Sequence, residues 1–305
     1  MNKIKNQWLL IVTEFFTKEH WLHTVFSRKT IDYFFSLLGK FWLAFNITSA
    51  VWPSIKSYTY NYYLIVGFII VTFLYASRPH LSIVSNVKNC DMKIEIHIGD
   101  IFDFSGAYVI PTNTTFDVDI STGIISSQSL QGQFASRLYN NNFQDLDNDL
   151  ECALNGINYK ELSDNRIGKK KKYPIGTIAQ IRKSDKVFYM VAIANLNSYG
   201  AIENAGFADI QDSLLELWNK VGSAGNIDPL VIPLIGSLRC RLKEPRIEFV
   251  KEIVNSYSKA CVNKKLCEKL IIVISTEDYK KHEIDTNQLE EYLNCKCKFP
   301  EFSAI

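Results

Sequence analysis

The sequence lacks a strong excess of charge of either sign. It has 34 Lys and Arg residues against 32 Asp and Glu residues, which gives a formal net charge of +2 over 305 residues. Domains that bind nucleic acid usually carry a clear basic excess, so this balance argues against a general nucleic-acid-binding protein. A hydrophobic share of 47% also excludes a disordered chain.

Cysteine and histidine are present, but their spacing does not match a metal site. Cys295 and Cys297 are too close for a C-x2-C knuckle and have no partner pair, and the five histidines form no H-E-x-x-H motif. We therefore expect no metal, and a reduced, cytosolic environment for the soluble part of the chain. Most of the cysteines are then small core residues; the seven are Cys90, Cys152, Cys240, Cys261, Cys267, Cys295 and Cys297.

An activated nucleophile is also missing from the sequence. Cys240 has no neighbouring histidine, and neither order nor spacing reveals a Ser-His-Asp set. The sequence therefore favours a binding protein over an enzyme, and we expect neither a catalytic residue nor a cofactor.

Long apolar runs are concentrated in the first third of the chain. Residues 34–53 are almost wholly apolar or small apart from Lys40 and Asn46, and residues 61–77 carry no charge. A bilayer core needs about 20 helical residues, which each run reaches with its flanks. We expect a transmembrane helical hairpin over residues 31–79; the alternative is a buried hairpin of a soluble protein. Lys40 either snorkels to the interface or lines a helix–helix contact.

Basic residues around these runs indicate the orientation of the hairpin. They cluster before the first run and after the second, while the short link between the runs holds only Lys56. By the positive-inside rule both termini are cytoplasmic. Residues 1–30 form an amphipathic segment suited to the membrane interface, with no small-residue cleavage site of a signal peptide.

The pattern changes beyond residue 90, where short β-rich runs alternate with amphipathic helical patterns. This alternation predicts an α/β domain over residues 90–305, with layers of helices around a mostly parallel sheet. The expected strands are 93–98, 107–111, 177–181, 187–196, 229–235 and 269–275, and the expected helices are about 128–140, 204–222, 245–262 and 285–294.

Unusual loops follow several of these strands. Ligands bind outside the carboxyl ends of strands in such sheets. In the run "VIPLIGSLRCRL" (231–242), the apolar strand residues are followed by Gly236 and Ser237 and then by two arginines. Backbone N–H groups of such a loop suit an anion, with Arg239 or Arg241 adding charge. The alternative is a plain turn with exposed arginines. The basic run "RIGKKKKYPIG" (166–176) is most simply a solvated loop.

Taken together, "IGDIFDFSGAYVIPTNTTFD" and "VIPLIGSLRCRL" resemble the macro domain, the ADP-ribose-binding module, over about residues 92–298. With the apolar hairpin and "SLQGQF", the chain is similar to the membrane-bound macro-domain effectors of type II Thoeris anti-phage systems. The resemblance implies a macro-type three-layer fold in a bacterial inner membrane protein. It also implies that the chain binds an ADP-ribose-derived signal, histidine–ADP-ribose, which a TIR-domain partner produces.

The same resemblance implies a mechanism and a binding site. Signal binding would drive formation of a homo-oligomer in the lipid bilayer, and membrane disruption would kill the cell. Independently of the resemblance, small or polar residues such as Gly39, Ser49, Ala50 and Gly67 are suited to packing between helices of such an oligomer. Asp100 would accept from the adenine amino group, and Tyr279 would cover the adenine. The ligand-binding residues implied are Asp100, Ile101, Thr112, Asn113, Thr114, Gly123, Ile124, Ser126, Gly236, Ser237, Leu238, Arg239 and Tyr279.

Two loops depart from the macro-domain pattern. The usual glycine triplet is replaced by "DISTGIISSQS", and the second phosphate loop reads G-S-L instead of G-T-G. Both changes alter how closely the backbone can approach a diphosphate, and they leave room for a bulkier conjugate of ADP-ribose. Two alternatives stay open: a membrane-tethered ADP-ribosyl hydrolase, and a passive reader of ADP-ribose that uses the hairpin only as an anchor.

Overall fold

The structure is a computed structural model in which the chain divides into two compact units, Met1–Leu81 and Ser82–Ile305. It describes residues 11–13, 15–16, 21, 25–52, 62–78, 81–88, 91–121, 123–163, 167–197, 202–203, 206–225, 227, 229–236, 244–262, 264–281 and 284–299.

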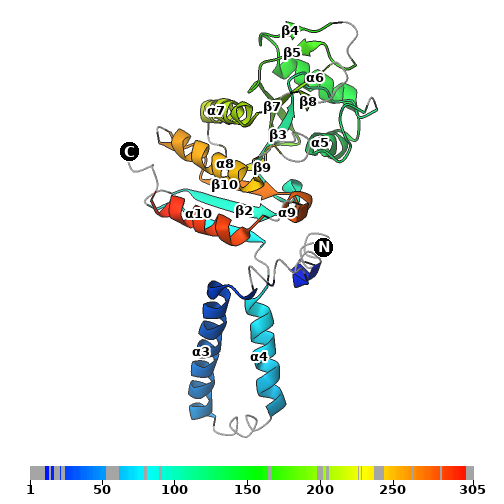
Figure 1. Ribbon diagram of the computed structural model, residues 1–305. Helices are drawn as coiled ribbons and strands as arrows, with labels where there is room; N and C mark the ends of the chain where they lie inside the picture. Colours follow the sequence, from blue (N-terminus) through cyan, green and yellow to red (C-terminus); the bar gives the residue numbers. More distant parts are fainter. Residues whose placement is uncertain are drawn as a thin grey trace. The chain divides into compact units, whose positions relative to one another are not determined.

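The first unit contains two helices, α3 (Arg28–Val51) and α4 (Tyr62–Ala76), which lie side by side (Figure 1). Ser27 caps α3, because its side-chain oxygen accepts a hydrogen bond from the backbone N–H of Thr30 at 3.2 Å. The rings of Phe41 and Phe68 stack across the pair with centroids 3.7 Å apart. The two apolar runs of the sequence therefore form two helices that pack on each other.

Among the described helices, α3 alone is long and apolar enough to cross a membrane, over Thr30–Val51. The apolar part of α4 is shorter, Ile65–Ala76. The 15 residues of α4 rise about 22 Å, less than the roughly 30 Å of a bilayer core. A second crossing needs residues before Tyr62, which lie outside the described part of the chain, so the two-span arrangement stays a prediction.

The second unit is built on one large sheet with the strand order β1-β2-β10-β9-β3-β7-β6, in which β8 also pairs with β7. The strands from β2 to β7 in this order run parallel, and β1, β6 and β8 are antiparallel to their neighbours. The strands are β1 (Ser82–Asn86), β2 (Lys93–Ile98), β3 (Ala107–Asn113), β6 (Ile178–Lys183), β7 (Lys186–Leu196), β8 (Ile202–Glu203), β9 (Leu230–Pro233) and β10 (Lys269–Ile274). A separate two-stranded sheet pairs β4 (Lys160–Glu161) with β5 (Lys171–Lys172).

Helices cover both faces of the large sheet (Figure 1). Tyr108 and Ile110 of β3 pack with Phe134 and Leu146 in one core cluster, under α5 and α6. The sheet's other face packs against α7, α8 and α10. The predicted three-layer α/β domain with a mostly parallel sheet is thus confirmed. The helices of this unit are η3 (Ile101–Asp103), α5 (Leu130–Tyr139), α6 (Phe143–Ala153), α7 (Phe207–Ser223), α8 (Arg246–Cys261), α9 (Thr276–Lys281) and α10 (Thr286–Lys298).

The core of the sheet follows from the alternation of side chains along its strands. Successive side chains point to opposite faces, so a strand buried on both faces reads as a continuous apolar run. In β3 the residues Tyr108, Val109 and Ile110 are all fully buried, and β9 is buried throughout. These strands therefore form the rigid centre of the unit, and their ends are fixed in position.

An ion cluster surrounds the buried Glu95 of β2. Its carboxylate is 2.8 Å from Lys93 Nζ, 2.9 Å from His97 Nε2 and 3.5 Å from Lys269 Nζ. Burial raises the pKa of Glu95, but the hydrogen bonds from Lys93 and His97 and the lysine charges outweigh it and lower that pKa to about 2. Because the folded-state pKa lies below the unfolded value, the carboxylate stabilises the fold above about pH 4.5, and this contribution is lost as the pH falls toward 2.

We expect Glu95→Gln to lower the free energy of unfolding by about 1 kcal/mol at pH 7, since a charge-assisted hydrogen-bond acceptor is replaced by a neutral one. Urea unfolding of both proteins between pH 3 and pH 7 measures this. The difference between them should shrink as the pH falls below about 4.5. A difference that stays constant over this range would contradict the role of the ionised carboxylate.

Candidate functional site

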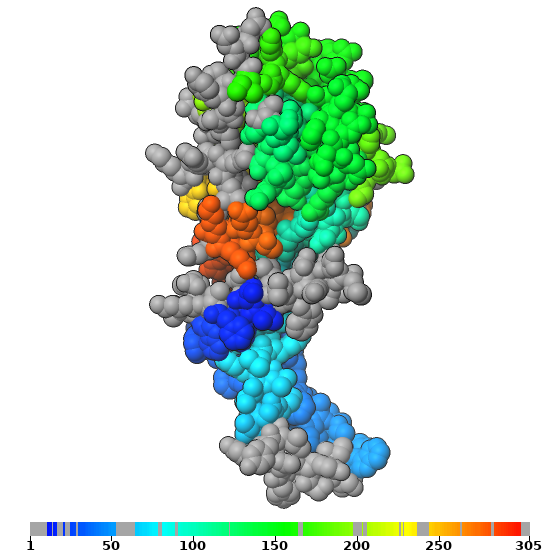
Figure 2. Space-filling model, turned by 90° about the vertical axis from the view of Figure 1, so that its right-hand side faces the viewer, coloured from blue at the N-terminus to red at the C-terminus, as the bar shows by residue number. Residues whose placement is uncertain are grey.

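The carboxyl ends of the parallel strands meet at one edge of the large sheet. β2 ends before Asp100, β3 ends at Asn113, β7 passes Asn195, β9 ends before Gly236 and β10 ends before Ser275. Open α/β sheets bind ligands at this edge. Figure 2 shows a face of this unit on which the α5–α6 region (green) and the segment around α9 (orange) are exposed. The edge is therefore the candidate binding site.

The loop after β3 is held by the side chain of Asn113. The amide oxygen of Asn113 accepts hydrogen bonds from Thr115 N at 3.0 Å and Asp117 N at 3.3 Å, and the Thr115 hydroxyl oxygen lies 2.7 Å from it. Thr114 Oγ1 donates to Asn195 Oδ1 of the neighbouring strand at 3.2 Å. A short polar side chain that bonds the backbone ahead of it fixes a tight turn. The loop thus leaves the strand in one defined conformation.

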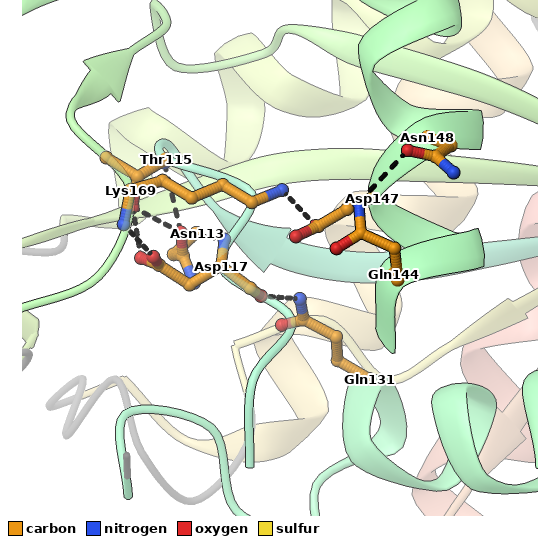
Figure 3. A network of polar contacts seen from close by, with 8 residues as sticks. All are labelled: Asn113, Thr115, Asp117, Gln131, Gln144, Asp147, Asn148 and Lys169. Carbon is orange, nitrogen blue, oxygen red and sulfur yellow. Dashed lines mark hydrogen bonds and ion pairs between the residues drawn. The ribbon is translucent and has the colours of Figure 1, made fainter. Parts of the chain in front are cut away.

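Asp117, which the sequence analysis did not select, is the centre of this polar network (Figure 3). It is 3% exposed, and its two carboxylate oxygens accept from Lys169 N at 2.7 Å and from Thr115 Oγ1 at 2.5 Å. Gln131 Nε2 donates to the backbone oxygen of Asp117 at 2.5 Å. Since a buried carboxylate is costly unless it is hydrogen-bonded, these contacts hold three separate chain segments together.

The basic run 166–176 is attached to the site, which corrects its interpretation as a plain solvated loop. Gly168 lies so close to Asp117 that a Cβ there would be 2.5 Å from the carboxylate. Tyr173 N donates to the backbone oxygen of Thr114 at 2.8 Å, and Lys169 Nζ is 2.5 Å from Asp147 Oδ1 of α6. Contacts across more than 50 residues of sequence therefore bring the basic run to the carboxyl edge, with the charge of Lys169 itself paired with Asp147. An anionic ligand would benefit from further lysine charge of this run.

Asp100 and Ile101 follow β2 at the same edge. Asp100 begins η3, where one oxygen accepts from Phe102 N at 3.0 Å and the other is 2.7 Å from Arg137 Nη1 of α5. Its side chain is 37% exposed, so it still faces solvent. Ile101 belongs to the core cluster, which leaves only its backbone for a ligand. Tyr279 is half-buried on α9, directly after β10.

The residues predicted for the first phosphate loop differ in burial, and some of them belong to the core. Gly123 is exposed with a φ of 75°, which suits glycine. Ile124 is buried in a small cluster that contains Leu196, the last residue of β7. Ser126 accepts hydrogen bonds from Ser129 through its backbone oxygen and so supports the start of α5. The loop is thereby brought to the end of β7, beside the Asn113 turn.

The second predicted loop is described only at Gly236. Its φ is 86°, and its carbonyl oxygen accepts from Arg246 Nη1, a side chain 7% exposed, at 2.5 Å. Ser237, Leu238 and Arg239 lie outside the described residues. Thr112 is 5% exposed at a bulge of β3, and among the described residues its hydroxyl has no hydrogen-bond partner.

Within the described part of the chain, no group of three or more His, Cys, Asp or Glu side chains is arranged to hold a metal ion. Residues 94–275, well over half of the chain, match the sequence model of the family described as Thoeris protein ThsA, Macro domain. The chain belongs to this family. The unit Ser82–Ile305 is accordingly a macro domain, as its resemblance implied.

A relative and two solved structures are similar to this chain. The Thoeris protein ThsA of Bacillus amyloliquefaciens (strain Y2) is 24% identical over 207 residues, which cover 66% of this chain and 67% of that protein. Among solved structures, a mutant macrodomain of Oceanobacillus iheyensis is 13% identical with a TM-score of 0.47. The matched region covers 72% of this chain and 96% of that macrodomain. The same macrodomain with ADP is 13% identical with a TM-score of 0.42, and covers 69% and 97%.

Proposed function

We propose that this chain is a membrane-anchored anti-phage effector whose cytosolic macro domain binds an ADP-ribose-derived signal, in keeping with the ThsA macro domain family. The signal is histidine–ADP-ribose or a similar conjugate made by a TIR-domain partner. Binding drives assembly of a homo-oligomer, which disrupts the bacterial inner membrane. Both termini are cytoplasmic, and the hairpin crosses the bilayer twice.

The observation that carries the proposal is the set of hydrogen bonds that fixes the loops at the carboxyl edge of the sheet. Asn113 and Asp117 hold the turn after β3, and Lys169 brings the basic run to the same place. A nucleotide diphosphate needs backbone donors in a fixed loop and nearby positive charge, and this edge supplies both kinds of group. Asn113, Gly123, Gly236 and the backbone of Ile124 are the proposed contacts to the ribose and diphosphate.

The topology of the chain supports coupling between binding and the membrane. β1 is antiparallel to β2, and its first residue, Ser82, pairs with His97, next to the carboxyl end of β2. Only residues 77–81 separate α4 from this strand. A ligand at the carboxyl edge therefore binds at the edge of the sheet at which β1 begins. If the oligomeric and the separate state of the chain bind this ligand with different affinities, it shifts the population toward the state that binds it more tightly.

Replacement of Asp100 tests the proposed adenine contact. We expect Asp100→Ala to weaken binding of ADP-ribose by about 1–3 kcal/mol, because the carboxylate would no longer accept from the adenine amino group. Calorimetry with the full chain in detergent measures the effect. Asp103→Ala, which removes an exposed acid of the same turn, should bind as the native protein does. Equal affinities for all three proteins would refute the adenine role.

The effector function is tested by the mass of the full chain in detergent and by membrane potential in cells. Addition of histidine–ADP-ribose should raise the mass and, in cells, abolish the potential. An unchanged mass together with an unchanged potential would contradict the proposal. Release of free ADP-ribose from the conjugate would support the hydrolase, and full activity with an unrelated anchor in place of residues 28–78 would support the passive reader.

A further inference from the structure

The two long faces of helix α3 differ in chemistry. One face packs on α4: Phe34 contacts Phe73, with ring centroids 5.7 Å apart, Phe41 stacks on Phe68, and Ser49 is 4% exposed. In a helix each residue advances by about 100°, so residues three or four apart share a face. The α4-facing side of α3 is therefore aromatic along most of its length, with a buried serine near its carboxyl end.

The opposite face of α3 carries a row of mainly small and polar residues, with Leu43 as its one large apolar member, at alternating spacings of four and three. All members of this row, which we call the polar stripe, are exposed, and by helical rotation they lie on the side away from α4. Lys40 is exposed next to it. The polar stripe consists of Asp32, Ser36, Gly39, Leu43, Asn46 and Ala50.

Asn46 makes the polar stripe unsuited to lipid. One N–H of its side chain donates to the backbone oxygen of Trp42 at 2.9 Å, and among the described residues the amide oxygen has no hydrogen-bond partner. Hydrocarbon offers no donor, so an unpaired amide in a bilayer costs free energy that a partner helix would recover. An asparagine is also self-complementary, because each of two side chains can donate to the other.

The outer face of α4 has none of these features. Ile70, Val71 and Leu74 are exposed there at 52%, 64% and 45%, and the nearby hydroxyl of Thr72 already donates to the backbone oxygen of Phe68. Such a face matches lipid tails in polarity and needs no protein partner. The two helices thus divide the outside of the hairpin into an apolar side and a side that requires a polar neighbour.

We infer that the polar stripe is the contact surface between copies of this chain, and that it packs against α3 of a second copy. Gly39, Ser36 and Ala50 allow two backbones to approach closely, and Asn46 pairs with Asn46 of the second copy. The alternation of three and four is the repeat of left-handed helix pairs, in which one polar position fixes register. This inference rests on the proposed membrane insertion and adds the residues through which the copies meet.

Cysteine cross-linking in native membranes tests which face meets the second copy. The hairpin contains no native cysteine, since the first in the sequence is Cys90. After mild oxidation, with and without added ADP-ribose, Gly39→Cys and Asn46→Cys should form covalent dimers in amounts several-fold above Gly67→Cys and Ile70→Cys. Equal yields at all four positions in both conditions, or higher yields on α4, would overturn the inference.

Two glycines offer a matched pair of substitutions. A Cβ at Gly39 or at Gly67 meets nothing within 4 Å, so leucine fits the isolated hairpin at either position. We expect Gly39→Leu to weaken self-association in detergent about three- to tenfold, as expected for the loss of close helix approach and the asparagine contact, while Gly67→Leu has no effect. A loss of association that is the same for both variants would contradict the polar stripe as the interface.

Membrane extraction separates a failure of this inference from a failure of the proposed function. If alkaline carbonate releases the native chain from membranes, the proposed insertion is wrong, and the inference fails with it. If the chain is retained and histidine–ADP-ribose still depolarises cells, but the cross-links do not favour the polar stripe, only the inference is wrong. Unchanged binding of ADP-ribose by all variants shows that the macro domain is intact.

Discussion

Asp117→Ala is expected to lower the free energy of unfolding by about 2–4 kcal/mol, and the affinity for ADP-ribose about tenfold or more. The substitution removes the acceptor of the backbone N–H of Lys169 and one of the two acceptors near the Thr115 hydroxyl. The turn after β3 and the basic run then lose their common anchor. Urea unfolding and calorimetry with the full chain in detergent measure the two effects.

Asp147→Ala is the matched control for this substitution. It also removes a carboxylate next to Lys169, but its ion pair with Lys169 Nζ is about 30% exposed on both sides. Such a pair contributes at most about 1 kcal/mol, so stability and binding should change little. The account of Asp117 would be wrong if both variants lost the same stability and the same affinity.

Gly236→Ala is expected to lower the free energy of unfolding by about 2–3 kcal/mol and to reduce binding of ADP-ribose about tenfold. Alanine is strained at a φ of 86°, and its Cβ would be 2.7 Å from Ile210 Cδ1 and 3.0 Å from Phe249 Cε1. Relief of this overlap moves the end of β9, from which the second proposed phosphate loop begins. Thermal unfolding and calorimetry provide the readouts.

Gly225→Ala separates the two causes of that effect. Gly225 has nearly the same φ, 87°, but a Cβ there meets nothing within 4 Å. It should therefore show the backbone cost alone, about 1 kcal/mol, with unchanged ligand binding. If the two alanine variants have the same stability and the same affinity, the close packing of Gly236 on Ile210 and Phe249 does not matter to the site.

The main strands could be predicted because their residues are buried on both faces. Continuous apolar runs mark β3, β7, β9 and β10, whereas β2 alternates isoleucine with polar residues; the expected limits of all five agree with the structure to within a few residues. The edge strand β1 was missed because its buried and exposed residues alternate in a short polar sequence. Helix α6 was missed as well, since acidic residues surround its few buried leucines.

The polar network could not be predicted in the same way. Asp117 and Lys169 are 52 residues apart, and a run of lysines has the same local pattern whether it is solvated or anchored. The motif "NTTFD" did contain a usable indication, because asparagine and threonine commonly bond the backbone ahead of them. In the hairpin, composition alone did not separate Ser49, which faces α4, from Gly39 and Ala50, which do not.

The most direct test is calorimetry of the full chain in detergent with histidine–ADP-ribose, followed by analysis of the recovered ligand. Our account predicts saturable binding that Asp117→Ala weakens and Asp147→Ala does not, and it predicts that the conjugate is recovered intact. Absence of binding to both this conjugate and ADP-ribose, or cleavage of the conjugate, would contradict the central claim that the carboxyl edge of this macro domain is a sensor.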